Sequence, residues 1–244
     1  MTTGDEDRAR EEFEEGNRLF TADDFAGALA AYDRSLELRP NDPDTLGNRG
    51  VALNRLGRHE EALAAHDRAL DLRPDHPGIH YNRGIPLADL GRYEEALASY
   101  DRALELRADD SGSHSGRGNA LSKLGRHEEA LAAFDRSLEV SPDNPSPHYN
   151  RGNELSRRGR YEEALAAYDR SLALRPDDPA ALNNRGLALN HLSRHEEALA
   201  AHDRSLALRP DDPATLNNRG LALAGLGRYR QAIRSYERAI RAFH

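Results

Sequence analysis

Residues 42–74 read DPDTLGNRGVALNRLGRHEEALAAHDRALDLRP. Asp42 can cap a helix whose first position is Pro43, where the missing N–H costs nothing, and Gly57 favours the end of that helix. After this glycine, alanines and leucines recur at helical spacing until Pro74 stops the pattern. One stripe of the second segment carries Ala62, Leu63, Ala69 and Leu70. The stretch therefore predicts two short amphipathic helices joined by a turn.

The same pattern recurs along the chain with a period of 34 residues. The closing proline stands at Pro40, Pro74, Pro142, Pro176 and Pro210, and Ala108 occupies the one missing place. Two helices of this size cannot bury their apolar stripes alone, so the repeats must stack on one another. We expect residues 1–8 to be disordered and residues 9–244 to form a single domain. The seven expected repeats cover residues 9–42, 43–76, 77–110, 111–144, 145–178, 179–212 and 213–244.

These repeats resemble the tetratricopeptide repeat family. In the second repeat the matching residues are Leu46, Gly50, Leu53, Ala62, Ala69 and Pro74, and in the last they are Leu216, Gly220, Leu223, Ala232 and Ala239. The resemblance implies an all-α fold, a right-handed α-solenoid or superhelix of helix-turn-helix hairpins, with the first helix of each hairpin on the concave side. It also implies that each recurring glycine, such as Gly50, lies where the two helices of a hairpin pack closely.

The composition limits the classes of function. The chain has no cysteine, which removes disulfides, thiolate metal sites and thiol nucleophiles together. Its net charge of -8 argues against nucleic acid as a partner, and no apolar run could span a membrane. No nucleophile stands with a base and an orienting partner, and no glycine-rich phosphate loop is present. We expect a cytoplasmic, non-catalytic protein with no cofactor and no membrane or nucleic-acid partner.

Asparagines gather on one face of the first helices. This face carries 12 of the 14 asparagines in the chain. An amide is both donor and acceptor, so a row of amides can grip the backbone of an extended peptide. The row resembles the asparagine ladder of O-linked N-acetylglucosamine transferases, which holds extended polypeptide. We predict that a partner protein or peptide binds at Asn17, Asn48, Tyr81, Asn82, Asn119, Tyr149, Asn150, Asn153, Asn183, Asn184, Asn217 and Asn218. The alternative is that duplication merely copied the amides.

Recurring charged residues invite a second interpretation. The first helices repeat an arginine where the family usually has leucine, and the second helices repeat an aspartate. We expect arginine–aspartate pairs between neighbouring helices, because an unpaired buried guanidinium would be costly. A basic ladder for an anionic ligand is the alternative. The arginines are Arg49, Arg83, Arg117, Arg151, Arg185 and Arg219, and the aspartates are Asp33, Asp67, Asp101, Asp135, Asp169 and Asp203.

Two other functions remain open at this stage. His80, His114 and His148 occupy the same place in three successive repeats, so a metal-binding or enzymatic protein could use this column. The ends of the chain are also oppositely charged. The first 15 residues carry seven acidic and two basic side chains, whereas residues 228–244 carry five arginines and one glutamate. Because no further helix would cover the last repeat, we consider a self-assembling scaffold built by salt-sensitive head-to-tail association.

Overall fold

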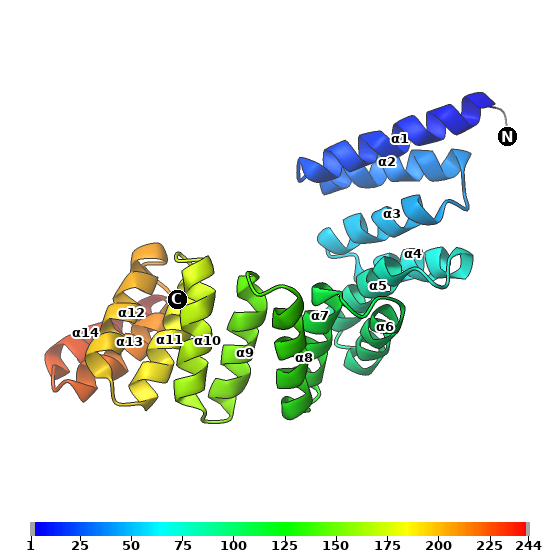
Figure 1. Cartoon of the computed structure of the whole chain (residues 1–244). Coiled ribbons are helices and arrows are strands. Elements are labelled where there is room, and N and C mark those ends of the chain that lie inside the picture. Colours follow the sequence, from blue (N-terminus) through cyan, green and yellow to red (C-terminus); the bar gives the residue numbers. More distant parts are fainter. Residues whose placement is uncertain (1–2, 243–244) are drawn as a thin grey trace. The chain divides into compact units, whose positions relative to one another are not determined.

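A computed structural model describes residues 3–242, and over this range the chain forms fourteen helices and no strand (Figure 1). The helices fall into two compact units, divided between Arg126 and His127. The first unit contains α1 (Thr3–Thr21), α2 (Phe25–Leu38), α3 (Pro43–Arg55), α4 (His59–Leu72), α5 (Pro77–Asp89), α6 (Tyr93–Leu106) and α7 (Ser111–Lys123). The second contains α8 (His127–Val140), α9 (Pro145–Arg157), α10 (Tyr161–Leu174), α11 (Pro179–His191), α12 (His195–Leu208), α13 (Pro213–Gly225) and α14 (Tyr229–Ala242).

These helix pairs confirm the predicted all-α solenoid, and their ends follow from local sequence. The carboxylate of Asp42 accepts a hydrogen bond from the backbone N–H of Thr45 at 3.0 Å, which caps α3 as expected. Gly57 turns the chain from α3 into α4 with a φ of 74°. At the equivalent turn between α11 and α12, Ser193 adopts a φ of 58° without glycine.

One expectation, about the N-terminal residues, differs from the structure. Residues 3–8 are helical rather than disordered, and Asp5 and Glu6 lie in the first turn of α1, where the helix dipole favours acidic side chains. Residues 1–2 lie outside the described range. The contacts within the chain divide it into two compact units, and a single domain over residues 9–244 stays a prediction. Each repeat in a stacked array contacts only its neighbours, so periodicity alone does not require one compact body.

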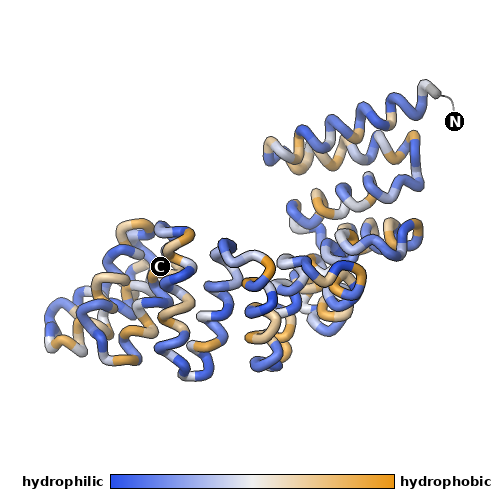
Figure 2. The backbone as a smooth tube through the Cα atoms, in the orientation of Figure 1, coloured by the Kyte–Doolittle hydropathy of each residue, from blue (hydrophilic) through white to orange (hydrophobic). Residues whose placement is uncertain are grey.

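Small residues allow the helices to approach closely. In the first unit, the Tyr100 ring is buried between α5 and α7. A Cβ atom on Gly84 would lie 2.5 Å from this ring, and one on Gly116 would lie 2.6 Å from it. The recurring glycine therefore makes room for the ring of the second helix, as the sequence predicted. Figure 2 shows apolar segments recurring from helix to helix between hydrophilic ones.

The predicted arginine–aspartate pairs are present. In each of the six cases the arginine Nε donates to an aspartate Oδ1 at 2.5–2.7 Å, which joins the second helix of one repeat to the first helix of the next. Arg83 also donates to the hydroxyl of Ser99 at 2.7 Å. These partners confirm the structural interpretation of the arginines. Within the described range, no helix is both long and apolar enough to cross a membrane.

Candidate functional site

The first helices of successive repeats are neighbours within each unit. α3 contacts α1 and α5, α5 contacts α7, and α11 contacts α9 and α13. We call the side of these helices that bears the predicted binding residues the asparagine face. In the first unit it carries Asn17, Asn48, Tyr81, Asn82 and Asn119. In the second unit it carries Tyr149, Asn150, Asn153, Asn183, Asn184, Asn217 and Asn218.

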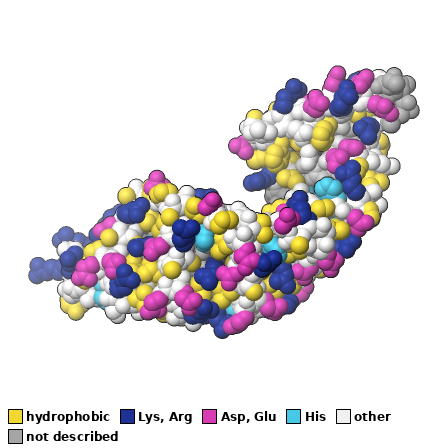
Figure 3. Space-filling model, viewed as in Figure 1, with side chains coloured by type: hydrophobic (Ala, Val, Ile, Leu, Met, Phe, Trp, Pro, Cys, Tyr) yellow, Lys and Arg dark blue, Asp and Glu magenta, His cyan; other side chains and the backbone are white. Residues whose placement is uncertain are grey.

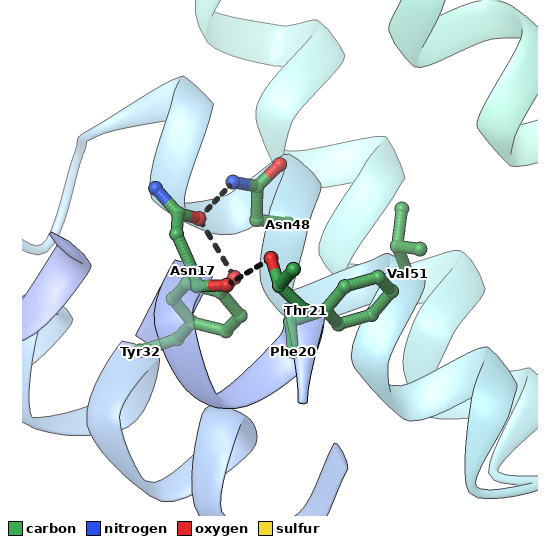
Figure 4. Close-up of a pocket in the computed structure, with 6 residues that line it drawn as sticks. All are labelled: Asn17, Phe20, Thr21, Tyr32, Asn48 and Val51. Carbon is green, nitrogen blue, oxygen red and sulfur yellow. Dashed lines mark hydrogen bonds between the residues drawn. The ribbon is translucent and has the colours of Figure 1, made fainter. Parts of the chain in front are cut away.

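In the first unit, a pocket of about 270 Å³ opens between α1, α2 and α3 (Figure 4). The side-chain oxygen of Asn17 accepts two hydrogen bonds there, from the Tyr32 hydroxyl at 2.8 Å and from the Asn48 amide at 2.9 Å. The side-chain oxygen of Asn17 thus joins a tyrosine of the second helix to the amide of the next repeat. The lining residues are Asn17, Phe20, Thr21, Tyr32, Asn48 and Val51.

The second unit contains the same arrangement. The side-chain oxygen of Asn153 accepts from the Tyr168 hydroxyl and from the Asn184 amide, each at 2.9 Å. The Asn184 amide also donates to the Tyr149 hydroxyl at 3.2 Å. This group borders a pocket of about 460 Å³ lined by Tyr149, Asn153, Ser156, Arg157, Tyr168, Asn184, Leu187 and His191. Burial raises the pKa of Tyr32 and of Tyr168, which keeps both hydroxyls protonated and able to donate.

The other predicted asparagines have different surroundings. Asn218 donates to the side-chain oxygen of Asn183 at 3.1 Å, which again links successive repeats. Asn119 and Asn217 are exposed, and Asn150 is half-buried. Asn82 is half-buried, and its amide has no hydrogen-bond partner among the residues that the structure describes. The hydrogen-bond partners of the predicted asparagines therefore differ from repeat to repeat.

A second pocket of the first unit adjoins the one in Figure 4 and shares Val51 with it. It encloses about 380 Å³, and both Tyr81 and Asn82 belong to its wall. The full lining is Val51, Asn54, Arg55, His66, Tyr81, Asn82 and Ile85. The first unit thus has two pockets along α1, α3 and α5 that meet at Val51.

The histidine column does not form a shared metal site. The Nε2 atoms of His80, His114 and His148 each form a hydrogen bond with the backbone carbonyl six residues earlier, at 2.7, 2.9 and 3.0 Å. Each ring therefore has a local partner that fixes it beside the turn before its own helix. Over residues 3–242, no group of three or more histidine, aspartate or glutamate side chains is placed to hold a metal ion. The structure gives the metal-binding alternative no support.

Tyr32 and Tyr168 were not among the residues predicted from the sequence, although both donate a hydrogen bond to an asparagine of this face. The sequence does contain a pattern that predicts their role, because each tyrosine follows an asparagine of the asparagine face, Asn17 or Asn153, by 15 residues. By contrast, the residue 15 places before Tyr100 is Ile85, which cannot accept a hydrogen bond through its side chain. A tyrosine preceded by asparagine at this spacing therefore marks a polar cluster.

A buried carboxylate in the second unit also escaped the sequence analysis. The side chain of Glu154 on α9 is buried, with one oxygen 2.6 Å from Nδ1 of His127 on α8 and the other 3.3 Å from Arg157. Neither residue of this pair was among those predicted from the sequence for a site. Alanine stands at the equivalent place in the sixth repeat, at Ala188, so this pair is peculiar to its repeat.

Comparison with known families identifies the repeats. A tetratricopeptide repeat model matches residues 81–145 and 149–213, which together exceed half of the chain. The chain belongs to the tetratricopeptide repeat family. Two further tetratricopeptide repeat models match residues 41–109 and 192–242.

Individual tetratricopeptide repeat proteins agree with this assignment. The small glutamine-rich tetratricopeptide repeat-containing protein 2 of Mycosarcoma maydis is 40% identical over 60 residues, which are 24% of this chain and 17% of that protein. The match thus spans less than a fifth of that curated relative. A tetratricopeptide repeat protein of Parabacteroides merdae has a TM-score of 0.72 at 20% identity, with 98% of this chain and 94% of that chain covered. YrrB, described as having an unusual peptide-binding site, has a TM-score of 0.60 at 24% identity, with 76% and 96% covered.

Proposed function

We propose that this protein is a non-catalytic protein-interaction scaffold whose asparagine face binds an extended segment of a partner protein. The observation that carries the proposal is the pair of adjoining pockets in the first unit, lined by asparagine, tyrosine and apolar side chains from successive repeats. Concave sites that are lined mostly by apolar side chains, with a few polar groups in fixed positions, are typical of ligand binding. The pocket around Asn153 and Asn184 supports the same activity for the second unit.

The hydrogen bonds among the asparagines prepare this face for a ligand. Asn17 is fixed through its side-chain oxygen, and its amide nitrogen still has hydrogens to donate. Side chains that are already held lose less conformational freedom when a partner binds. An extended peptide offers backbone carbonyl and N–H groups at regular intervals, which match a row of amides. The resulting contacts hold the peptide backbone while the pockets receive its side chains.

The comparisons are consistent with this proposal. YrrB has the same fold and is described as a peptide-binding protein. Its likeness at 24% identity supports the architecture, and the activity of the present chain is inferred from the pockets. Tyr81 and Tyr149, which line pockets in different units, would supply apolar contact area together with a hydroxyl group.

The test begins with affinity capture and mass spectrometry, which identify partner proteins. Overlapping synthetic peptides from a captured partner are then titrated into the protein, with binding followed by fluorescence polarisation. Asn82→Ala should weaken peptide binding about tenfold, because it removes both an amide donor and an acceptor. Asn41→Ala is the matched control, since Asn41 lies outside the asparagine face and its side chain contacts Arg68. Equal affinity of the wild type and Asn82→Ala would contradict the proposal.

One observation favours a second function, self-association. On α14 an apolar stripe is exposed, with Tyr229 66%, Ile233 55% and Ile240 61% accessible. Arg234 and Arg241 lie on the same helix, and Figure 3 shows basic side chains gathered at this end of the second unit. The acidic α1 of another copy has the complementary charge. Such a head-to-tail contact would build rings or fibres.

Light scattering at several salt and protein concentrations tests self-association. The mass should rise with concentration and fall as salt is added, because charges of opposite sign attract less strongly when screened. Replacing Arg234 and Arg241 by glutamate should abolish the rise in mass. A monomer at low salt and high protein concentration would exclude this second function.

A further inference from the structure

His66 stands at a position that most repeats fill with a larger ring. The equivalent residues are Tyr32, Tyr100, Phe134, Tyr168, His202 and Tyr236. Its side chain is fully buried, and neither ring nitrogen has a hydrogen-bond partner within the described part of the chain. A buried polar atom without a partner is costly, and native structures usually avoid it. His66 therefore needs either a structural or a functional explanation.

The sixth repeat provides an internal comparison. There His202 is equally buried, but its Nε2 lies 3.3 Å from the amide nitrogen of Asn190, which can donate to it. Asn54 holds the equivalent place beside His66, yet its amide donates to Asp89 at 3.2 Å. In the seventh repeat the equivalent of Asp89 is Gly225, which cannot compete for Asn190. The Asn54 amide thus bonds to Asp89, and no hydrogen bond joins it to His66.

The pocket bordered by His66 also has an excess of unused donors. Arg55 lines it, and within residues 3–242 its guanidinium pairs with no carboxylate, although it lies 5.9 Å from the centre of the Phe25 ring. Most other arginines of the chain are paired with carboxylates, as Arg49 is. The Tyr81 hydroxyl and the Asn82 amide likewise have no partner among the described residues. Four groups able to donate thus surround a space of about 380 Å³.

We propose that this pocket receives the carboxylate of an aspartate or glutamate side chain from the bound peptide, with Arg55 as its charge partner. The proposal rests on the function proposed above and specifies the chemistry of one subsite. A carboxylate has acceptors only, so it can use several of these donors together. Arg55 offers charge, while Asn82 and His66 offer neutral N–H groups. The side-chain amide of glutamine has the same size, but its NH2 group would face donors of the pocket rather than acceptors. The pocket would therefore bind glutamate more tightly than glutamine.

The protonation state of His66 agrees with this assignment. Burial lowers the pKa of His66 to about 4, while the charge of Asp67 acts to raise it and that of Arg83 to lower it. The ring is therefore neutral at pH 7 and carries one N–H donor. A bound carboxylate stabilises the protonated ring and should raise this pKa. The NMR signal of the His66 ring would therefore report the charge of the group bound in this pocket.

The probe is an N-acetylated and amidated heptapeptide, SASESAS, whose only carboxylate is the glutamate side chain. SASQSAS, SASLSAS and SASYSAS are the matched peptides. Each is titrated to millimolar concentration into the full-length protein while the histidine ring signals are followed by NMR. His66→Tyr assigns the signal and should fold, because tyrosine occupies this place in four other repeats.

SASESAS should shift the His66 signal and raise its pKa, and SASQSAS should bind about tenfold more weakly. Arg55→Gln and His66→Tyr should each remove the preference for glutamate, whereas His202→Tyr should keep it. Equal binding of the two peptides would overturn this proposal, as would a stronger response to SASLSAS or SASYSAS. Absence of any response at His66 would also overturn it. The proposed function would survive that result if partner peptides still bound in a manner sensitive to Asn82→Ala.

Discussion

Two asparagines on the asparagine face should respond to alanine substitution in opposite directions. The side-chain oxygen of Asn153 accepts hydrogen bonds from Tyr168 and Asn184, whereas the Asn82 amide has no partner among the described residues. Both residues lie inside helices, where alanine is about 0.6 kcal/mol more favourable than asparagine. The substitutions Asn153→Ala and Asn82→Ala therefore differ chiefly in the hydrogen bonds that are lost.

The magnitudes follow from these contacts. Asn153→Ala leaves the buried Tyr168 hydroxyl without its acceptor, which costs about 1–3 kcal/mol, and the lost contact with Asn184 costs about 1 kcal/mol more. After the gain in helix propensity, the free energy of unfolding should fall by about 2 kcal/mol. Asn82→Ala should instead raise it by about 0.6 kcal/mol, because only the propensity changes.

Urea denaturation followed by circular dichroism measures both effects, with hydrogen exchange in α5 and α9 to localise them. Hydrogen exchange is needed because stacked repeats can unfold in parts. Tyr168→Phe is the control background, in which Asn153→Ala should cost less because no hydroxyl is left unpaired. If Asn153→Ala proved as stable as Asn82→Ala, the hydrogen bonds of Asn153 would contribute nothing to the stability of the fold.

Three further predictions concern the packing and the charges. Gly84→Ala should destabilise the protein by about 2 kcal/mol, because the new Cβ would lie 2.5 Å from the Tyr100 ring. Gly47→Ala should instead stabilise the protein by up to about 1 kcal/mol in the same urea assay, because its Cβ would meet no atom nearer than 3.9 Å. A double-mutant cycle on Arg151 and Asp135 should give a coupling free energy of about 0.5–1 kcal/mol that decreases in high salt. A coupling near zero would mean that this ion pair does not contribute to stability. The pKa of His66 is about 4 in the folded protein and about 6.5 in the unfolded chain. Between these pH values the unfolded chain binds more protons, so the free energy of unfolding should fall as the pH drops from 7 to 5. His66→Tyr should remove on the order of 2 kcal/mol of that fall, and an unchanged pH profile would show that this histidine is not buried in its neutral form.

The repeating sequence was sufficient to predict the fold and part of its chemistry. A 34-residue period with Asp42, Pro43 and Gly57 at its boundaries specifies helix pairs, because caps, first-turn proline and turn glycine act locally. The arginine–aspartate pairs were also predictable, since both members recur in every junction between repeats and a buried arginine needs a partner. Periodicity thus determined what is common to all repeats.

The tertiary structure decided how individual repeats differ. Asn54 and Asn190 have the same position in their repeats, yet the amide of Asn54 donates to Asp89, while the amide of Asn190 donates to the Asn218 carbonyl and contacts His202. Likewise, Asn17 and Asn48 contact each other across 31 residues. A hydrogen bond depends on distances of a few tenths of an ångström between side chains of different helices. The residue pattern placed these amides on one face, but only their packing determined which side chain each of them contacts.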